Sequence, residues 1–388
     1  MSKRAHEGQE SELESKRNRA SREGHTEDCQ DNLCEGCDVG EVEISFVRKD
    51  AQGQTVEPSA QELLVMAIEE SNDDIKKRLF DLALDKYQKD EPENRVGYAT
   101  CLVELGKSID VQESIREGLD VLRGEKTKTT EVLLALSGAA IALVNSIRQK
   151  QIQYLVEEQQ KLEENDDDEE EEIEENEELK QKQKPSKEET KIYAEAVDSL
   201  TEALKTGSSD EALFKEAHTV LNEMRTYGQS LNIPYYSELS TKVLHTVVDL
   251  IKQLPDYEQH DEALTLWAAC LLNEQKPLET EEEQMKVMDK IESLLNDANK
   301  IHAKQNEGKE NPWVWQMLAM NRINQSNLAE DEDQAIELYE GAIEAFKKAI
   351  ALKPDDHELA AMFQVIAASE EKANAAAEEE DEEEEEEE

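Results

Sequence analysis

The stretch that decides the fold runs from Trp313 to Pro354 and reads WVWQMLAMNRINQSNLAEDEDQAIELYEGAIEAFKKAIALKP. In its second half, apolar residues recur every three or four positions, which is the spacing of one face of an α-helix. These residues are Ala335, Ile336, Tyr339, Ala342, Ile343, Phe346, Ala349 and Ile350. The pattern predicts a helix that buries one stripe of side chains and ends near Pro354.

The same stretch carries the spacing of a tetratricopeptide repeat, which is a unit of two packed helices. The second helix has the pattern A-x3-F-x2-A-x4-P, formed by Ala342, Phe346, Ala349 and Pro354. The first helix has a shorter match, W-x2-L followed by a small residue, formed by Trp315, Leu318 and Ala319. Arg322 stands where the repeat has an aromatic residue. Trp315 and Ala342 are 27 residues apart where a standard repeat has 16, so 11 residues are extra. Because one repeat cannot bury its own face, further repeats must flank it.

Helical patterns with caps and stops recur on both sides of an acidic interruption. We predict helical repeat blocks at residues 59–162 and 188–376, the second containing the repeat at 313–354. The predicted fold class is all-α, a tetratricopeptide-like solenoid with disordered acidic segments.

The net charge of the chain is −51. Two acidic runs, Glu163–Glu178 and Glu378–Glu388, contain no basic residue, so we predict a disordered acidic linker at 163–187 and an acidic tail at 377–388. Even without the runs, acids outnumber bases, so the folded body is acidic as well. Such a surface repels phosphates, and direct nucleic-acid binding is not expected. The acidic runs either contact basic proteins or only solubilise the chain.

Residues 1–58 are predicted to form a disordered tail that is basic and contains cysteines. Two basic clusters are separated by eleven residues, as in a bipartite nuclear import signal: Lys3, Arg4, Lys16, Arg17 and Arg19. Two such clusters on one segment are typical of import-receptor ligands, although a merely solubilising basic tail has the same composition. The sequence therefore predicts a nuclear protein that binds an import receptor.

Four soft metal ligands follow in the tail, with the spacing H-x3-C-x4-C-x2-C: His25, Cys29, Cys34 and Cys37. They would suit tetrahedral zinc. The segment after them alternates Val42, Ile44 and Phe46 and then has a turn-like Ala-Gln-Gly, which favours a β-hairpin. Because the spacing matches no strong zinc signature, we keep the four residues as weak candidates and predict no metal or cofactor.

No motif of a catalytic site is present. The sequence has no glycine-rich phosphate loop, no G-x-S-x-G and no H-E-x-x-H. Cys101 and Cys270 lie in apolar helical patterns, where a thiol behaves as a small hydrophobe. His218 and His245 lie on predicted helices, where they are expected to be satisfied in the core or to face a partner. We therefore predict that the protein is not an enzyme.

No signal-peptide pattern follows Met1, and no apolar run reaches the ~20 residues that cross a bilayer. The apolar residues 132–144 are too short for a span by this measure. We expect a cytosolic or nuclear protein without a membrane contact.

Three features together resemble the fungal family called enhancer of translation termination. They are the basic start MSKRAHEGQESELESKRNR, the acidic break between two helical halves and the closing segment WVWQMLAMNRINQSNLAEDEDQAIELYEGAIEAFKKA. The resemblance implies a nuclear, non-enzymatic scaffold that is required for correct translation termination and takes part in transcription regulation. It also implies a prolyl-hydroxylase-like termination factor as the protein partner. The cysteine cluster does not belong to the family's pattern.

Two other classes of function remain open at this stage. An acidic tetratricopeptide-repeat histone chaperone has the same layout, because acidic runs suit basic histones, but the tight repeat consensus around the interruption is missing. A metal-dependent enzyme would need ligands that the helical body does not offer.

Overall fold

The computed structural model describes residues 48–49, 55–164, 177–207, 211–274, 280–357 and 359–364. Two short strands come first, β1 (Arg48–Lys49) and β2 (Thr55–Val56). They pair antiparallel, with Arg48 opposite Val56 and Lys49 opposite Thr55. The predicted β-hairpin is confirmed at these four residues, whereas the alternating residues before Arg48 lie outside the described part of the chain.

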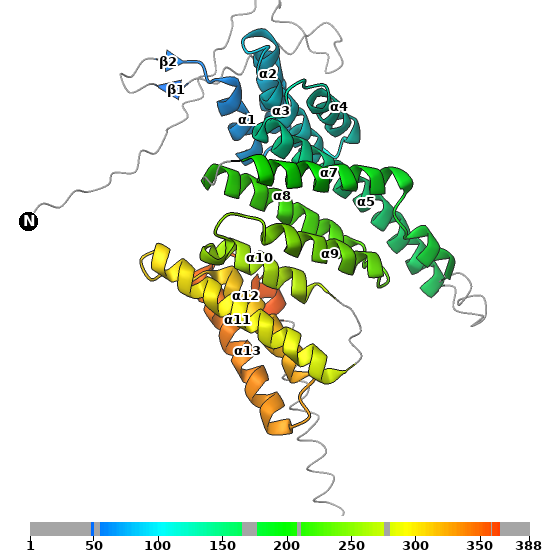
Figure 1. Cartoon of the computed structure of the whole chain (residues 1–388), viewed down its shortest axis with the longest axis vertical. Helices are drawn as coiled ribbons and strands as arrows, with labels where there is room; N and C mark the ends of the chain where they lie inside the picture. The colour runs from blue at the N-terminus through cyan, green and yellow to red at the C-terminus, as the bar shows by residue number, and fades with distance from the viewer. Residues whose placement is uncertain are drawn as a thin grey trace, which may run out of the picture.

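The rest of the described chain is helical (Figure 1). The first half contains α1 (Ala60–Glu69), α2 (Asp73–Lys89), α3 (Arg95–Ser108), α4 (Gln112–Arg123), α5 (Thr130–Glu164) and α7 (Lys187–Thr206). The second half contains α8 (Glu211–Ser230), α9 (Glu238–Ile251), the short 3-10 helix η1 (Tyr257–Gln259), α10 (Asp261–Leu272), α11 (Glu281–Gln305), α12 (Pro312–Ser326) and α13 (Glu332–Leu352). Residues 177–182 and 359–364 are also helical.

Successive helices pack side by side in pairs: α1 with α2, α3 with α4, α5 with α7, α8 with α9, α10 with α11 and α12 with α13. Each pair also contacts the next one along the chain, through α2 and α3, α4 and α5, α5 and α8, α9 and α10, and α11 and α12. A stack in which each unit packs mainly against its neighbours is the arrangement of a helical repeat protein. The predicted all-α repeat fold is thereby confirmed.

Several helix starts follow directly from local sequence. Ser59 and Ser186 form capping boxes with Glu62 and Glu189, so that side chains satisfy backbone N–H groups that the first turn leaves free. Thr280 accepts a hydrogen bond from the backbone N–H of Glu283 at the start of α11. These contacts set the register in which each apolar stripe faces its neighbour.

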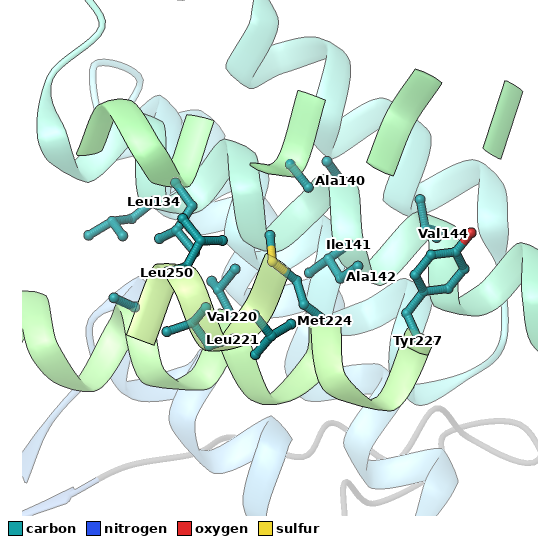
Figure 2. Packing of buried hydrophobic residues seen from close by; sticks show 14 of the residues in the cluster. Leu134, Ala140, Ile141, Ala142, Val144, Val220, Leu221, Met224, Tyr227 and Leu250 are labelled. Carbon is teal, nitrogen blue, oxygen red and sulfur yellow. The ribbon is translucent and has the colours of Figure 1, made fainter. Parts of the chain in front are cut away.

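One large hydrophobic core runs from Ala99 on α3 to Cys270 on α10. Helix α5 lies at its centre, and Figure 2 shows Ile141 and Val144 of α5 facing Met224 and Tyr227 of α8. Smaller cores lie under α1–α3, between α10 and α12, and between α12 and α13. The core therefore continues across the acidic interruption.

This continuity joins the two helical blocks that the sequence predicts on either side of residues 163–187. Helices α5 and α7 pack against each other, so the acidic run falls within one helical pair. The described chain resumes as helix at Glu177, and Leu179 is buried within the predicted linker. The interruption is consequently shorter than its composition indicates.

Helix α5 contradicts the expectation that no apolar segment of the chain is long enough to cross a bilayer. Its segment Thr130–Lys161 is long and apolar enough to cross a bilayer, judged by length and composition. Most of its apolar window, 61%, is buried inside the fold, as in the central helix of a packed core. Burial by neighbouring helices therefore explains the apolar composition of α5.

Candidate protein-binding groove

A groove lies between α3, α5 and α8. It consists of a cavity of about 420 Å³ and an adjoining one of about 120 Å³. The two cavities share four lining residues, Thr100, Ala135, Thr219 and Val220. We refer to this continuous depression as the α3–α5–α8 groove.

The floor of the groove is made of small residues on α5. Ala135, Gly138 and Ala139 line the narrower cavity. At Gly138, an added Cβ would meet Val220 Cγ2 at 3.7 Å, which is an ordinary van der Waals distance. The absence of a side chain there leaves space that α3 and α8 do not fill. The groove can therefore accept the aliphatic part of a side chain from another segment.

Carboxylates stand on the rim at both ends. Glu131 of α5 and Glu216 of α8 line the wider cavity, together with Gln61 of α1 and Asn94. Glu104 and Glu223 line the narrower one. The only basic residue in either lining is Lys107, so the groove carries a net negative charge.

Lys107 bridges the narrow end of the groove. Its Nζ lies 3.1 Å from Oε1 of Glu104 on α3 and 2.8 Å from Oε1 of Glu223 on α8. Burial acts to lower the pKa of Lys107, but the two carboxylates outweigh it, and the pKa is raised. The ammonium group is therefore held in its charged form between the two helices.

A buried polar cluster connects α5, α7 and the end of α8. Arg148 of α5 is fully buried and pairs with Glu189 of α7, Nη2 to Oε1 at 2.6 Å. It also donates to the backbone carbonyl of Gln183 at 2.7 Å. The Gln183 amide then donates to the carbonyls of Leu231 and Tyr235 after α8, each at 2.6 Å. We call Arg148, Gln183 and Glu189 the α5–α7 clamp.

The thiols of Cys101 and Cys270 are buried, and burial raises the pKa of each to about 12, which keeps both protonated. Within the described ranges, no group of three or more His, Cys, Asp or Glu side chains is arranged to hold a metal ion. What the groove offers is a small apolar floor and a carboxylate rim, which suit lysine and arginine side chains.

Two sets of predicted site residues lie outside the described chain. These are the import signal (Lys3, Arg4, Lys16, Arg17, Arg19) and the zinc candidates (His25, Cys29, Cys34, Cys37). Both stay predictions.

The predicted repeat residues lie on α12 and α13. Leu318, Ala342, Phe346 and Ala349 are fully buried, and Trp315 is partly buried and packs against the same cores. Pro354 is exposed just after the end of α13. Arg322, which replaces the aromatic residue of the standard repeat, donates to the carbonyl of Gly341 at 3.0 Å and pairs with Glu292 of α11 at 3.2 Å. A polar bridge thus holds three helices together at that position.

The two helical histidines occupy different settings. His218 is largely buried beside Phe214, and burial lowers its pKa. His245 is exposed and lies 2.9 Å from Oε1 of Glu274. The sequence did not predict a further histidine–carboxylate pair, in which Nδ1 of His302 lies 2.6 Å from Oδ2 of Asp261. Its partners are 41 residues apart, so no local spacing signals it.

Sequence reasoning also missed the groove and the clamp. The groove residues come from helices far apart in the chain and form no local motif. The clamp had one signal, Arg148, which is the first charged residue after the uncharged segment of α5 that begins at Val132. A guanidinium that is buried at the end of such a segment requires a partner.

Comparisons with known proteins complete the description. No family model matches the chain, and no curated protein matches it. Among solved structures, the S. pombe nuclear import adaptor Nro1 aligns with 15% identity and a TM-score of 0.44, covering 78% of this chain and 97% of that one. BtubC from P. vanneervenii aligns with 13% identity and a TM-score of 0.32, covering 77% and 92%. Similarities at this level of identity and TM-score assign neither a family nor a function to the chain.

Proposed function

We propose that this chain is a non-enzymatic nuclear adaptor that works by holding protein segments on its helical repeat surface. The observation that carries the proposal is the α3–α5–α8 groove, with its small apolar floor and carboxylate rim. Stacked helical pairs bury their own stripes and leave an extended surface for partners. The basic clusters at Lys3–Arg4 and Lys16–Arg19 support a nuclear location through an import receptor.

The process in which the adaptor acts is proposed from the resemblance to the enhancer of translation termination family. That resemblance rests mainly on residues 313–349, which form α12, the loop after it and most of α13. On this basis the chain promotes correct stop-codon recognition, takes part in transcription regulation and binds a prolyl-hydroxylase-like termination factor.

A readthrough assay tests the process. A strain lacking the gene should show raised stop-codon readthrough in a dual-reporter measurement, and the full chain should restore the normal level. The chain without Glu378–Glu388 should restore it as well, because an acidic tail buries no apolar area. Unchanged readthrough in the deleted strain would contradict the termination role. A drop in histone affinity on removing the tail would favour the chaperone alternative.

The nuclear location has its own test. Replacing Lys16, Arg17 and Arg19 by Ala should leave a fluorescent fusion in the cytoplasm, because a chain of 44.1 kDa plus its tag enters the nucleus slowly without a receptor. Replacing the α2 residues Lys76, Lys77 and Arg78 by Ala removes the same charge from the folded body and serves as the matched control. Nuclear accumulation of both variants would remove the import signal from the proposal.

A further inference from the structure

The α1–α2 pair leaves one side of α2 exposed at the N-terminal end of the helical stack (Figure 1). The buried residues Phe80 and Tyr87 of α2 belong to the core that this pair shares with α3. Leu82 lies on the opposite side of the helix and is 36% exposed. We call this side the outer face of α2, and it consists of Ile75, Arg78, Leu82 and Lys86. The end of a helical stack has no neighbouring unit to cover such a face.

The β1–β2 hairpin is attached beside the outer face of α2. Glu57 directly follows β2, and its Oε2 lies 3.3 Å from Nζ of Lys86. The next residue, Pro58, is buried. Each strand is only two residues long, and a two-stranded hairpin is marginally stable in water unless it packs against other structure. A further contact with the α1–α2 pair is therefore expected.

The register of the hairpin indicates which segment makes that contact. Arg48 is paired with Val56, so the same ladder continued toward the N-terminus places Phe46 opposite the buried Pro58. Every second residue from Val42 to Phe46 is apolar. In an extended strand these side chains lie on one side, so the segment can present a continuous apolar edge to a helix.

The segment and the outer face of α2 also match in length and charge. In extended form, Val42–Phe46 is about 13 Å long. Ile75 and Leu82 are separated by about 10 Å along the axis of α2. Arg78 is exposed between them, and its charge is opposite to that of Glu43 in the segment.

We propose that the segment Val42–Val47 docks on the outer face of α2 and closes the N-terminal end of the helical stack. Phe46 packs on Leu82 beside Pro58, and the apolar residues before it continue toward Ile75. The folded body then begins at Val42, and the predicted tail is shorter than residues 1–58. This cap is independent of the proposed adaptor role.

Hydrogen exchange of the full chain tests the cap, by mass spectrometry of peptides that cover Val42–Val47. Leu82→Asp places a charge on the outer face of α2 and should make exchange in this segment about tenfold faster than in the native chain. The matched control is Val65→Asp on α1, where the native side chain is 42% exposed and lies one turn after Gln61, which lines the groove. The control should exchange at the native rate. Circular dichroism melting checks that both variants are folded.

A change within the segment gives a second measurement and leaves the sequence of α1 and α2 intact. Phe46→Asp should make trypsin cleavage after Arg48 and Lys49 about tenfold faster, because a docked segment must detach before the protease can bind it. Ser45→Asp adds the same charge to the other side of the strand and should leave the cleavage rate unchanged.

Three results would overturn the proposal. The first is exchange of Val42–Val47 in the native chain at the rate of an unstructured peptide. The second is faster exchange in Val65→Asp but not in Leu82→Asp, which would place the segment on α1. The third is protection that disappears on dilution, because the segment would then come from a second copy of the chain.

Discussion

The α5–α7 pair and the α12–α13 pair are the same motif held together by different interactions. Between α12 and α13, the fully buried contact is apolar, formed by Ala342, Phe346 and Ala349, and the polar bridge from Arg322 to the carbonyl of Gly341 is only partly buried. Between α5 and α7, the buried contact includes the Arg148–Glu189 ion pair and a hydrogen bond from Ser137 to the carbonyl of Ala196 at 2.7 Å. The buried part of the first contact therefore relies on shape, whereas the buried part of the second includes directional polar bonds.

The difference follows from what joins the helices. A short link connects α12 to α13, so the ends of both helices stay close by covalent geometry. The link in the α5–α7 pair contains the acidic run, whose like charges repel one another. A buried ion pair with additional hydrogen bonds fixes one register, because a shift along the helix would leave a charge without its partner. The clamp thus opposes the separation that the acidic link favours.

The largest expected effect comes from breaking the clamp. Glu189→Ala leaves the Arg148 guanidinium buried and unpaired, which should lower the free energy of unfolding by about 3–5 kcal/mol. Urea unfolding followed by circular dichroism measures the loss. Replacing both residues, Arg148→Met with Glu189→Leu, should recover most of it. A single variant as stable as the native chain would show that the clamp does not hold the pair.

The apolar pair should respond somewhat less. Phe346→Ala removes a fully buried ring at the end of the stack and should cost about 3–4 kcal/mol, and Ala342→Glu should do similar harm by burying a charge. Ile336→Ala on the same helix is the control, since Ile336 is 53% exposed and should change stability by no more than ~0.5 kcal/mol. If all three variants had the same melting temperature, the α12–α13 face would not be packed as described.

A smaller, pH-dependent effect should come from His218, next to the larger core. Burial lowers its pKa from 6.5, while Glu262 and Asp261 oppose the shift. Below about that pH the unfolded chain binds the proton more readily than the folded one, so stability falls as the pH falls. His218→Gln should therefore lose less stability than the native chain between pH 7.5 and pH 5.5. If the urea midpoints of the native chain and the variant fall by the same amount between pH 7.5 and pH 5.5, the prediction is wrong.

The smallest expected effects come from replacing one glycine in each of the two helical pairs by alanine. Gly138→Ala should stabilise the chain by about 0.5–1 kcal/mol, because alanine favours a helix and the new Cβ has only an ordinary contact. At Gly341, a Cβ would lie 3.3 Å from Nη1 of Arg322, so Gly341→Ala should gain less. Thermal melting of both variants checks the order, and a larger gain at Gly341 would reverse it.

Much of the fold follows from local sequence, because helical repeats are built from neighbouring segments. The spacing around Ala342 and Phe346, the Thr280 cap and the β-hairpin could all be read in this way. The pairing of α5 with α7 could not. Acidic composition predicts a segment that favours water, but it carries no information about whether the apolar stripes on either side match.

The candidate site was harder to predict for a related reason. Thr100, Ala135 and Val220 become neighbours only when three helical pairs stack, and each residue is unremarkable within its own helix. Arg148 was the exception, since it directly follows the uncharged segment 132–147 and a buried charge requires a partner. Arg322 departs from the repeat pattern, and the sequence did not show what it does instead. In the structure it donates a hydrogen bond to the carbonyl of Gly341.

Because the acidic run lies within the α5–α7 pair, the backbone can be cut there without separating the two helices. The helices contact each other along their lengths, and the clamp lies beyond the link, so a cut between residues 165 and 176 leaves every described contact of α5 and α7 in place. Two fragments, 1–164 and 177–388, would then form a split protein whose reassembly reports on the clamp. New chain ends or an inserted domain at this link should be tolerated for the same reason.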